Sequence, residues 1–231
     1  MIHNPDGRLL LAASMVRRGS RVADIGCDHA YLSVYLVKNK IAKSVIASDI
    51  RTGPLEFARK NVAKAGLDDK IELRLQDGLD GISADEADDI VICGMGGNLI
   101  CDILSGAPWL KNREKNIVLQ PMSDSDTVRR WLYKNGFEIK RERAAEDRGH
   151  IYSVISAGYT GDCKDIGKTF AVTGGLCENM TRYEAEYLSH ERDVLMKRLS
   201  GLKASKNAEN YSAEINAVEA VISDLNRILE G

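Results

Sequence analysis

The segment Val22–Leu32 carries the residues whose types and spacing point most directly to chemistry. It reads Val-Ala-Asp-Ile-Gly-Cys-Asp-His-Ala-Tyr-Leu, which predicts a strand ending at Ile25, a tight turn through Gly26 and a helix beginning near Ala30. A doubly wound sheet binds nucleotides at this point. Asp28 stands where a dinucleotide fingerprint has its second glycine, and a carboxylate there would repel a pyrophosphate. The segment therefore predicts a nucleoside-like ligand other than a dinucleotide.

Aspartates also end two later apolar segments, and together they suit a cationic nucleoside. Asp24 and Asp28 are expected beside the sulfonium and ammonium groups of S-adenosylmethionine, and Asp49 beside its ribose diol. Asp77 with its neighbours would reach the adenine. One aspartate after a strand is most often a turn residue or helix N-cap, but four at successive strand ends predict one crevice. The predicted cofactor-binding residues are Asp24, Gly26, Cys27, Asp28, Asp49, Ile50, Asp77, Gly78, Gly94 and Met95.

Glycines follow the fourth apolar segment, Asp89–Cys93, in the run Gly-Met-Gly-Gly-Asn over residues 94–98. They would let a flat substrate approach the backbone near the cofactor's reactive methyl. The alternative is a glycine turn before a helix over Leu99–Leu104. Gly96 and Gly97 of this run, with the basic residues Arg129 and Arg130 further along the chain, are predicted to bind the substrate.

Short β-branched segments must position these residues. They lie at Arg21–Ile25, Ser44–Ser48, Ile71–Leu75, Asp89–Cys93, Asn116–Leu119, Phe137–Arg143 and Tyr152–Ser156. Amphipathic helical patterns such as Pro54–Ala65 and Ser125–Asn135 alternate with them, which predicts an α/β fold with a mostly parallel, seven-stranded, Rossmann-like sheet. The last two strands have no helix between them and should form an antiparallel pair separated by Ala144–His150.

The pattern changes after residue 158. Residues 158–180 are glycine-rich and read as irregular, and two long helical patterns follow. Apolar residues at spacings of three and four predict a helical hairpin with a coiled-coil seam, turning at Gly201 and Ala204–Asn210. The seam residues are Leu188, Leu195, Leu199, Leu202, Tyr211, Ile215, Val218, Ile222, Leu225 and Leu229. We predict a cofactor-binding domain over 1–158 and a two-helix domain over 159–231.

Composition narrows the class of protein. The 231 residues include 44% hydrophobic and 29% charged residues with a net charge of −2, so the chain is not a generic polycation for nucleic acid or membranes. No apolar run approaches the roughly 18 residues of a membrane span. Five scattered cysteines without a Cys-x-x-Cys pair exclude a disulfide scaffold and argue against structural zinc. We expect a cytoplasmic protein that binds neither a metal nor a membrane.

These motifs together are similar to a known family. The residues that carry the similarity are Ala23–Leu32, Thr52-Gly53-Pro54, Asp77-Gly78-Leu79, Gly94-Met95-Gly96-Gly97, Leu119-Gln120-Pro121, Trp131-Leu132 and the two-helix tail. The chain resembles the TrmK-type bacterial tRNA (adenine-22, N1)-methyltransferases over nearly its whole length. The resemblance implies transfer of a methyl group from S-adenosylmethionine to an adenine N1 in tRNA. The resemblance also implies that Gln120, Pro121 and Met122 bind the substrate. One residue departs from the pattern: Met122 stands where the family often carries Asn.

Methylation of adenine N1 needs stabilisation of a cationic product. A carboxylate near the N6 amino group would supply it, and Asp28 is the catalytic candidate, although it could simply bind the cofactor's methionine end. His29 could act as a general base or contact the RNA, with a backbone-bonded helix-start histidine as the alternative. Tyr31 could stack or donate a hydrogen bond at the pocket wall, or be a half-buried core residue.

Local charge offers a candidate RNA surface. Between Lys111 and Arg143 lie nine basic and five acidic residues, which could meet phosphates or simply form a solvated face. A second basic cluster, Lys197, Arg198, Lys203 and Lys206, lies near the expected hairpin tip. Two rival functions remain open: a methyltransferase acting on a small molecule or protein, and an RNA adapter that has lost catalysis. We expect a monomer or weak dimer that binds tRNA.

Overall fold

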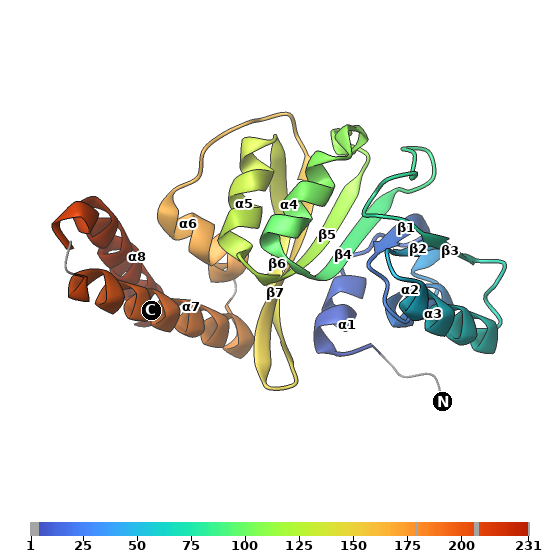
Figure 1. The fold of residues 1–231 in the computed structure, drawn as a ribbon, viewed down its shortest axis with the longest axis horizontal. Coiled ribbons are helices and arrows are strands. Elements are labelled where there is room, and N and C mark those ends of the chain that lie inside the picture. The colour runs from blue at the N-terminus through green and yellow to red at the C-terminus, as the bar shows by residue number, and fades with distance from the viewer. Residues whose placement is uncertain (1–4, 179, 206–207, 231) are drawn as a thin grey trace.

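A seven-stranded sheet organises the chain (Figure 1). The computed structural model describes residues 5–178, 180–205 and 208–230. The strands are β1 (Ser20–Ile25), β2 (Ala42–Asp49), β3 (Ile71–Leu75), β4 (Asp89–Gly96), β5 (Asn116–Ser123), β6 (Phe137–Asp147) and β7 (His150–Tyr159). Their order is β3-β2-β1-β4-β5-β7-β6; the first five are parallel, and β7 runs antiparallel to β5 and β6. The predicted α/β class and the antiparallel edge are confirmed.

Helices cover both faces of this sheet. They are α1 (Gly7–Ala13), α2 (Tyr31–Lys38), α3 (Thr52–Ala65), α4 (Gly97–Ser105), α5 (Ser125–Lys134), α6 (Lys168–Thr173), α7 (Arg182–Ala204) and α8 (Ser212–Glu230), with short 3-10 turns at Pro108–Leu110, Gly174–Cys177 and Ala208–Tyr211. The first three pack on one face and α4 and α5 on the other. Among the described residues, none of these helices has the length and apolarity to cross a membrane.

The apolar run of β4 shows why its sequence folds as a central strand. Ile90 and Ile92 point into the core beneath α4 and α5, while Val91 between them points into the core beneath α1, α2 and α3. All three side chains are fully buried. Successive strand residues face opposite sides of a sheet, so a strand covered on both faces must be apolar at every position.

Several strands run further than their sequence patterns predict, β6 and β7 among them, so only residues 148–149 separate these two strands instead of the expected Ala144–His150. The glycine run after Cys93 does not form a turn but extends β4 to Gly96, with irregular register against β5 and a left-handed φ of 78° at Gly94. Likewise β5 continues from Leu119 through Gln120 and Met122 to Ser123. The extensions of β4 and β5 pair with each other, Met95 with Pro121 and Gly96 with Ser123, and this pairing supplies hydrogen-bond partners for their backbone groups.

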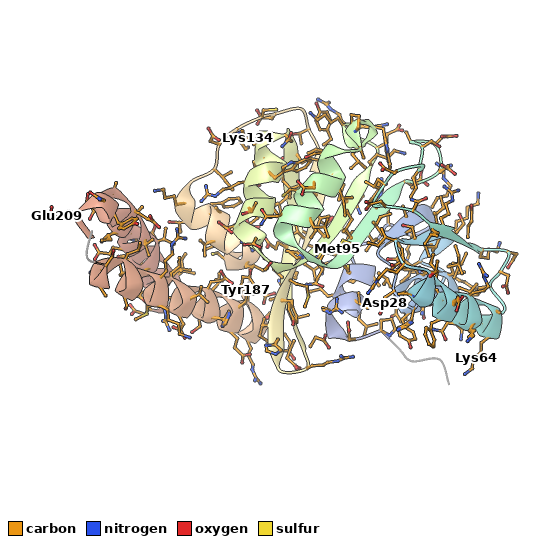
Figure 2. All side chains as sticks on the ribbon, in the orientation of Figure 1. Asp28, Lys64, Met95, Lys134, Tyr187 and Glu209 are labelled. Atoms are coloured by element: carbon orange, nitrogen blue, oxygen red, sulfur yellow. The ribbon has the colours of Figure 1, made fainter. Side chains whose placement is uncertain are left out.

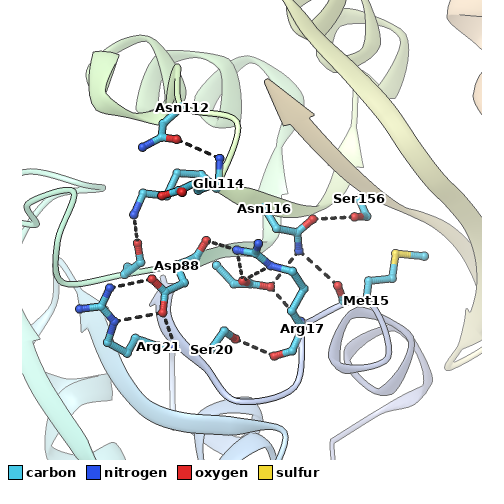
Figure 3. A network of polar contacts seen from close by, with 12 residues as sticks. Met15, Arg17, Ser20, Arg21, Asp88, Asn112, Glu114, Asn116 and Ser156 are labelled. Carbon is cyan, nitrogen blue, oxygen red and sulfur yellow. Dashed lines mark hydrogen bonds and ion pairs between the residues drawn. The ribbon is translucent and has the colours of Figure 1, made fainter. Parts of the chain in front are cut away.

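A polar network fixes the opposite, amino-terminal ends of the strands (Figure 3). The Arg17 guanidinium donates to the buried carboxylate of Asp89 at the start of β4, with 2.8 Å between Nε and Oδ1. Asn116, at the start of β5, donates to the same carboxylate and to the Met15 carbonyl oxygen, and accepts from Ser156 Oγ. This network holds the strand starts in register and lies away from the carboxyl ends where ligands bind in such sheets.

The carboxy-terminal part contains the expected hairpin and one unexpected helix. Helices α7 and α8 pack along each other and extend from the β6 edge of the sheet (Figure 1). Within the segment expected to be irregular, residues 168–173 form α6, which packs on α5 and α8. Gly201 lies inside α7 rather than in the turn, a correction to the prediction; residues 206–207 of the predicted turn lie outside the described residues. The hairpin is seated on the sheet by a third apolar cluster that includes Ala144, Leu188 and Leu225. The division at residue 158 stays a prediction.

Candidate active site

A cavity of about 710 Å³ opens at the carboxyl ends of β1, β2, β3 and β4. All ten predicted cofactor-binding residues line it: Asp24, Gly26, Cys27, Asp28, Asp49, Ile50, Asp77, Gly78, Gly94 and Met95. Figure 2 marks Asp28 and Met95 in this part of the molecule. The sheet brings them together because parallel strands end at one edge, although the residues are spread over 72 positions from Asp24 to Met95 in the sequence.

The loop after β1 is held in a strained conformation. Besides Gly26, the non-glycine residues Asp28 and Ala30 have left-handed φ angles of 49° and 57°. The backbone N–H groups of Gly26 and Cys27 both donate to the Ser48 carbonyl oxygen at 2.9 Å. Such backbone angles cost on the order of 1–3 kcal/mol each and persist only where the surroundings enforce them. A Cβ at residue 26 would also collide with the Met95 methyl group, so the glycine lets the two sides of the cavity meet.

Asp24 is the buried acid of the cavity. Its side chain is 3% exposed and accepts a hydrogen bond from Ser33 Oγ at 2.5 Å. Burial raises the pKa of Asp24 to about 6, because the charged form loses its hydration. A cationic ligand beside it would offset that loss and favour the carboxylate.

Asp49 and Asp77 stand at the ends of the next two strands. Asp49 is 5% exposed; its Oδ1 accepts from the Arg51 backbone N–H at 2.9 Å and lies 3.6 Å from Arg51 Nε. Asp77 is exposed at the rim. Buried and rim carboxylates therefore line the cavity from β1 to β3, and they give its wall a negative charge.

The three predicted catalytic residues lie close together, but only two of them line the cavity. Asp28 and Tyr31 line the cavity, and the Asp28 side chain is 60% exposed. His29 does not line it; its ring packs edge-on against Phe57 at 5.0 Å between centroids, with Nε2 at 3.7 Å from Asp28 Oδ1. Its Nδ1 is buried and without a hydrogen-bond partner among the described residues. His29 therefore lies against Asp28 and Phe57, with its ring centroid 5.7 Å from that of Tyr31, and does not itself line the cavity.

The cysteines at the cavity are not nucleophiles. Burial, with the neighbouring Asp24 carboxylate, raises the pKa of the Cys27 and Cys93 thiols far above its ordinary value. Both therefore stay protonated at neutral pH. In the described part of the chain, no group of three or more histidine, cysteine or acidic side chains is arranged to hold a metal ion.

The predicted substrate residues occupy several environments. Pro121 and Met122 line a second cleft of about 600 Å³ between the end of β5, the β6–β7 turn and α7, and Met122 is 45% exposed. Gly97 has no room for a side chain, since a Cβ would collide with the Asp124 backbone. Gln120 is fully buried; its Oε1 accepts from Arg8 and from the Gly94 N–H, so it supports the wall of the cavity from behind.

The burial of Arg129 contradicts the prediction that this residue binds RNA. Its side chain is 1% exposed and forms an ion pair with Glu142, with 2.7 Å between NH2 and Oε1. NH1 donates to the carbonyl oxygens of Ala171 and Val172, so the guanidinium joins α5 and β6 to the end of α6. Arg130 is exposed.

Other predicted basic positions are also engaged within the protein. Lys115 is buried, and its Nζ donates to the carbonyl oxygens of Ala84 and Ala87. Near the hairpin tip, Arg198 pairs with Glu214 at 2.6 Å and Lys203 with Glu219 at 2.6 Å. These pairs join α7 to α8, and Lys206 lies outside the described residues.

Sequence reasoning missed Arg8. It lies in α1, a helix of seven residues with no predicted pattern, and lines the cavity beside Gly94. The only signal in the sequence was its charge, because its partners Gln120 and Asp147 are more than 100 residues away.

The comparisons with known proteins agree with this site. Residues 6–155 match the family described as a methyltransferase domain. A Bacillus subtilis tRNA (adenine(22)-N(1))-methyltransferase is 40% identical over 150 residues, which span 65% of this chain and 63% of that protein. The crystal structure of B. subtilis TrmK superposes with a TM-score of 0.87 at 28% identity, covering 99% of this chain and all of that one.

A Streptococcus pneumoniae protein described as a putative tRNA (m1A22) methyltransferase, in complex with S-adenosyl-L-methionine, gives a TM-score of 0.81 at 30% identity. It covers 96% of this chain and 98% of that one. With the fold, the strand-end cavity and these relatives in agreement, the chain belongs to the TrmK family of methyltransferases.

Proposed function

We propose that this protein transfers the methyl group of S-adenosylmethionine to N1 of adenine 22 in tRNA. The observation that carries the proposal is the single cavity lined by all ten predicted cofactor residues, in a chain similar to the B. subtilis tRNA (adenine(22)-N(1))-methyltransferase. The S. pneumoniae relative crystallised with S-adenosyl-L-methionine supports the same cofactor.

The residues present fit this cofactor. The cavity volume of about 710 Å³ lies within the range of small-molecule sites, roughly 300–1,000 Å³. Asp24 and Asp28 supply negative charge for the sulfonium and ammonium, and Asp49 supplies acceptors for the ribose diol. The strained loop after β1 lines the cavity and would hold the cofactor with its backbone, as at other sites where strain is retained for function. When bound, the cofactor supplies a methyl group on a sulfonium, which is open to attack by a nucleophile.

The protein's own residues contribute position and charge. Adenine N1 carries a lone pair, so no residue has to generate the nucleophile, and orientation supplies much of the rate. The exposed carboxylate of Asp28 at the cavity would stabilise the positive charge that grows on the adenine, or accept a proton from its N6 amino group. His29, packed between Asp28 and Phe57, would keep the Asp28 loop in place.

The second cleft is the proposed path of the RNA. Pro121 and Met122 form part of its wall, directly after the buried Gln120 that supports Gly94 in the cavity. His150 and Tyr152 from the β6–β7 hairpin and His190 from α7 face the same cleft. The cleft therefore lies between the cofactor cavity and the helical hairpin. A monomeric or weakly dimeric state and a cytoplasmic location stay predictions.

A methyl-transfer assay tests the proposal. Radiolabelled S-adenosylmethionine and an unmodified tRNA transcript should yield N1-methyladenosine, located by nuclease mapping and mass spectrometry. A transcript with guanine at position 22 is the matched control and should receive no label. Binding of the cofactor and of tRNA without any methyl transfer would refute the proposed activity and support the alternative hypothesis of an RNA adapter that has lost catalysis. Methylation at another position would refute the assigned nucleotide.

A further inference from the structure

We propose that Arg8 binds the carboxylate of the cofactor's methionine half. The inference rests on the proposed function, because it takes S-adenosylmethionine as the ligand of the cavity. It concerns a residue of the amino-terminal helix, outside the strand-end positions to which the sequence motifs point.

The balance of charge in the cavity motivates the inference. Its charged lining consists of Asp24, Asp28, Asp49 and Asp77 on the acidic side and Arg8 and Arg51 on the basic side. The acids match the sulfonium, the ammonium and the ribose hydroxyl groups. The methionine half also ends in a carboxylate, and a carboxylate among acidic neighbours needs a charged donor.

The position of Arg8 fits that donor better than the position of Arg51. Arg51 follows β2 and pairs with Asp49, at the end assigned to the ribose. Arg8 NH1 lies 3.5 Å from the Cβ position of Gly94 on β4, and both Arg8 and Asp24 act electrostatically on the nearby Cys93 thiol. Arg8 therefore lies at the β1–β4 side, where Asp24 and the loop after β1 would receive the methionine half.

The guanidinium of Arg8 is held in place and still has donors to offer. Its Nε–H donates to Asp147 Oδ2 at 3.2 Å and NH1 donates to Gln120 Oε1 at 2.8 Å. The third nitrogen, NH2, lies 3.4 Å from Oδ2 of a second carboxylate, Asp6. Arginine has five N–H donors, so hydrogen bonds to the described residues use only two of them. A side chain fixed on one edge, with free N–H groups, is already oriented for a carboxylate.

The residues that contact Arg8, Gln120 and Asp147, hold its guanidinium in position. Gln120 is fully buried, and its Oε1 accepts from both Arg8 and the Gly94 N–H, so it sets the distance between the guanidinium and β4. Asp147 lies at the end of β6 and pairs with Arg8, with 3.2 Å between Oδ2 and Nε. Gln120 and Asp147 are positioning residues in this arrangement.

Calorimetric titration with two ligands tests the proposal without any turnover. The ligands are S-adenosylmethionine and its decarboxylated analogue, which lacks only the carboxylate. A charged hydrogen-bonded pair corresponds to a loss of roughly 10- to 100-fold in affinity. The wild-type protein should therefore prefer S-adenosylmethionine by about that factor, and Arg8→Ala should bind both ligands with nearly equal affinity.

Arg51→Ala is the matched control because it removes the other arginine of the same cavity. It should keep the wild-type preference between the two ligands, even where both affinities fall. Arg8→Lys should restore part of the preference, since an ammonium keeps the charge and loses the forked geometry. Thermal unfolding of the unliganded variants shows that each one is folded.

Two outcomes overturn the assignment: no preference in the wild-type protein, or an unchanged preference in Arg8→Ala, which includes an equal loss of both affinities. Failure of the proposed function is a separate result. In that case the wild-type protein would still discriminate between the two ligands but transfer no methyl group to tRNA.

Discussion

The buried Arg129–Glu142 pair leads to a quantitative prediction about how α6 is held against α5 and β6. Arg129→Met leaves the Glu142 carboxylate and the carbonyl oxygens of Ala171 and Val172 without their donors. Glu142→Gln leaves a buried guanidinium without its counter-charge and weakens the bond from the Gly175 N–H. Removing one partner of a buried ion pair costs about 3–5 kcal/mol, so each variant should lower the free energy of unfolding by that amount.

The double variant distinguishes an ion pair from two separate contributions. Arg129→Met with Glu142→Gln leaves no unpaired charge, so its cost should fall below the sum of the single costs by at least about 2 kcal/mol. Urea denaturation of the four proteins measures this coupling. In a chain of this length, each single variant should also lower Tm by roughly 6–20 °C.

Arg130→Met is the control for this cycle. It removes the adjacent arginine of α5, whose exposed guanidinium lies 4.0 Å from Asp126, and should change stability by less than about 0.5 kcal/mol. Additive effects of Arg129→Met and Glu142→Gln would refute the reasoning. So would a cost as small as that of Arg130→Met, because the pair would then not hold α6 against α5 and β6.

Three substitutions in the cavity give further predictions. Asp24→Asn should stabilise the unliganded protein by up to about 3 kcal/mol at pH 7, since a pKa raised from 3.8 to about 6 means that folding opposes the charged form. That gain should shrink as pH falls from 6 to 4, where Asp24 is protonated in the folded protein; a gain independent of pH in denaturant titrations would contradict it. Asp49→Ala should weaken cofactor binding by about 1–3 kcal/mol in calorimetry, and an unchanged affinity would remove Asp49 from the ribose site. Asp28→Asn should lower kcat for tRNA more than it weakens cofactor binding, which comparison of single-turnover rates with calorimetry measures; an equal loss in both would leave Asp28 as a cofactor ligand alone.

The cofactor cavity could be predicted from local sequence because its residues share one rule. Asp24, Asp49 and Asp77 each lie at or just beyond the carboxyl end of an apolar segment, and parallel strands end at one edge, so the fold alone places them together. The same rule predicts nothing about Arg8. It lies in a seven-residue helix whose stability comes from packing rather than from its own sequence pattern.

The sequence also did not reveal which charged residues are buried. Arg129 and Arg130 are neighbours in the sequence, yet one is buried and the other exposed. The difference arises because α6 and Glu142 surround one face of α5. The extensions of β4 and β5 escaped prediction for a similar reason, since each is a strand only because it pairs with the other.

The contacts of Arg8 also order the assembly of the protein. Arg8 meets Gln120 across 112 positions of sequence and Asp147 across 139. During synthesis, α1 is made before Gln120 and Asp147. The contacts of Arg8 with these two residues therefore cannot form until β5 and the β6–β7 hairpin are present. Contacts of such long range are the slow ones in folding, because a large loop must close before they form. The wall of the cavity built by Arg8 is therefore completed late, and a nascent chain that ends before residue 147 lacks the full set of contacts that hold it.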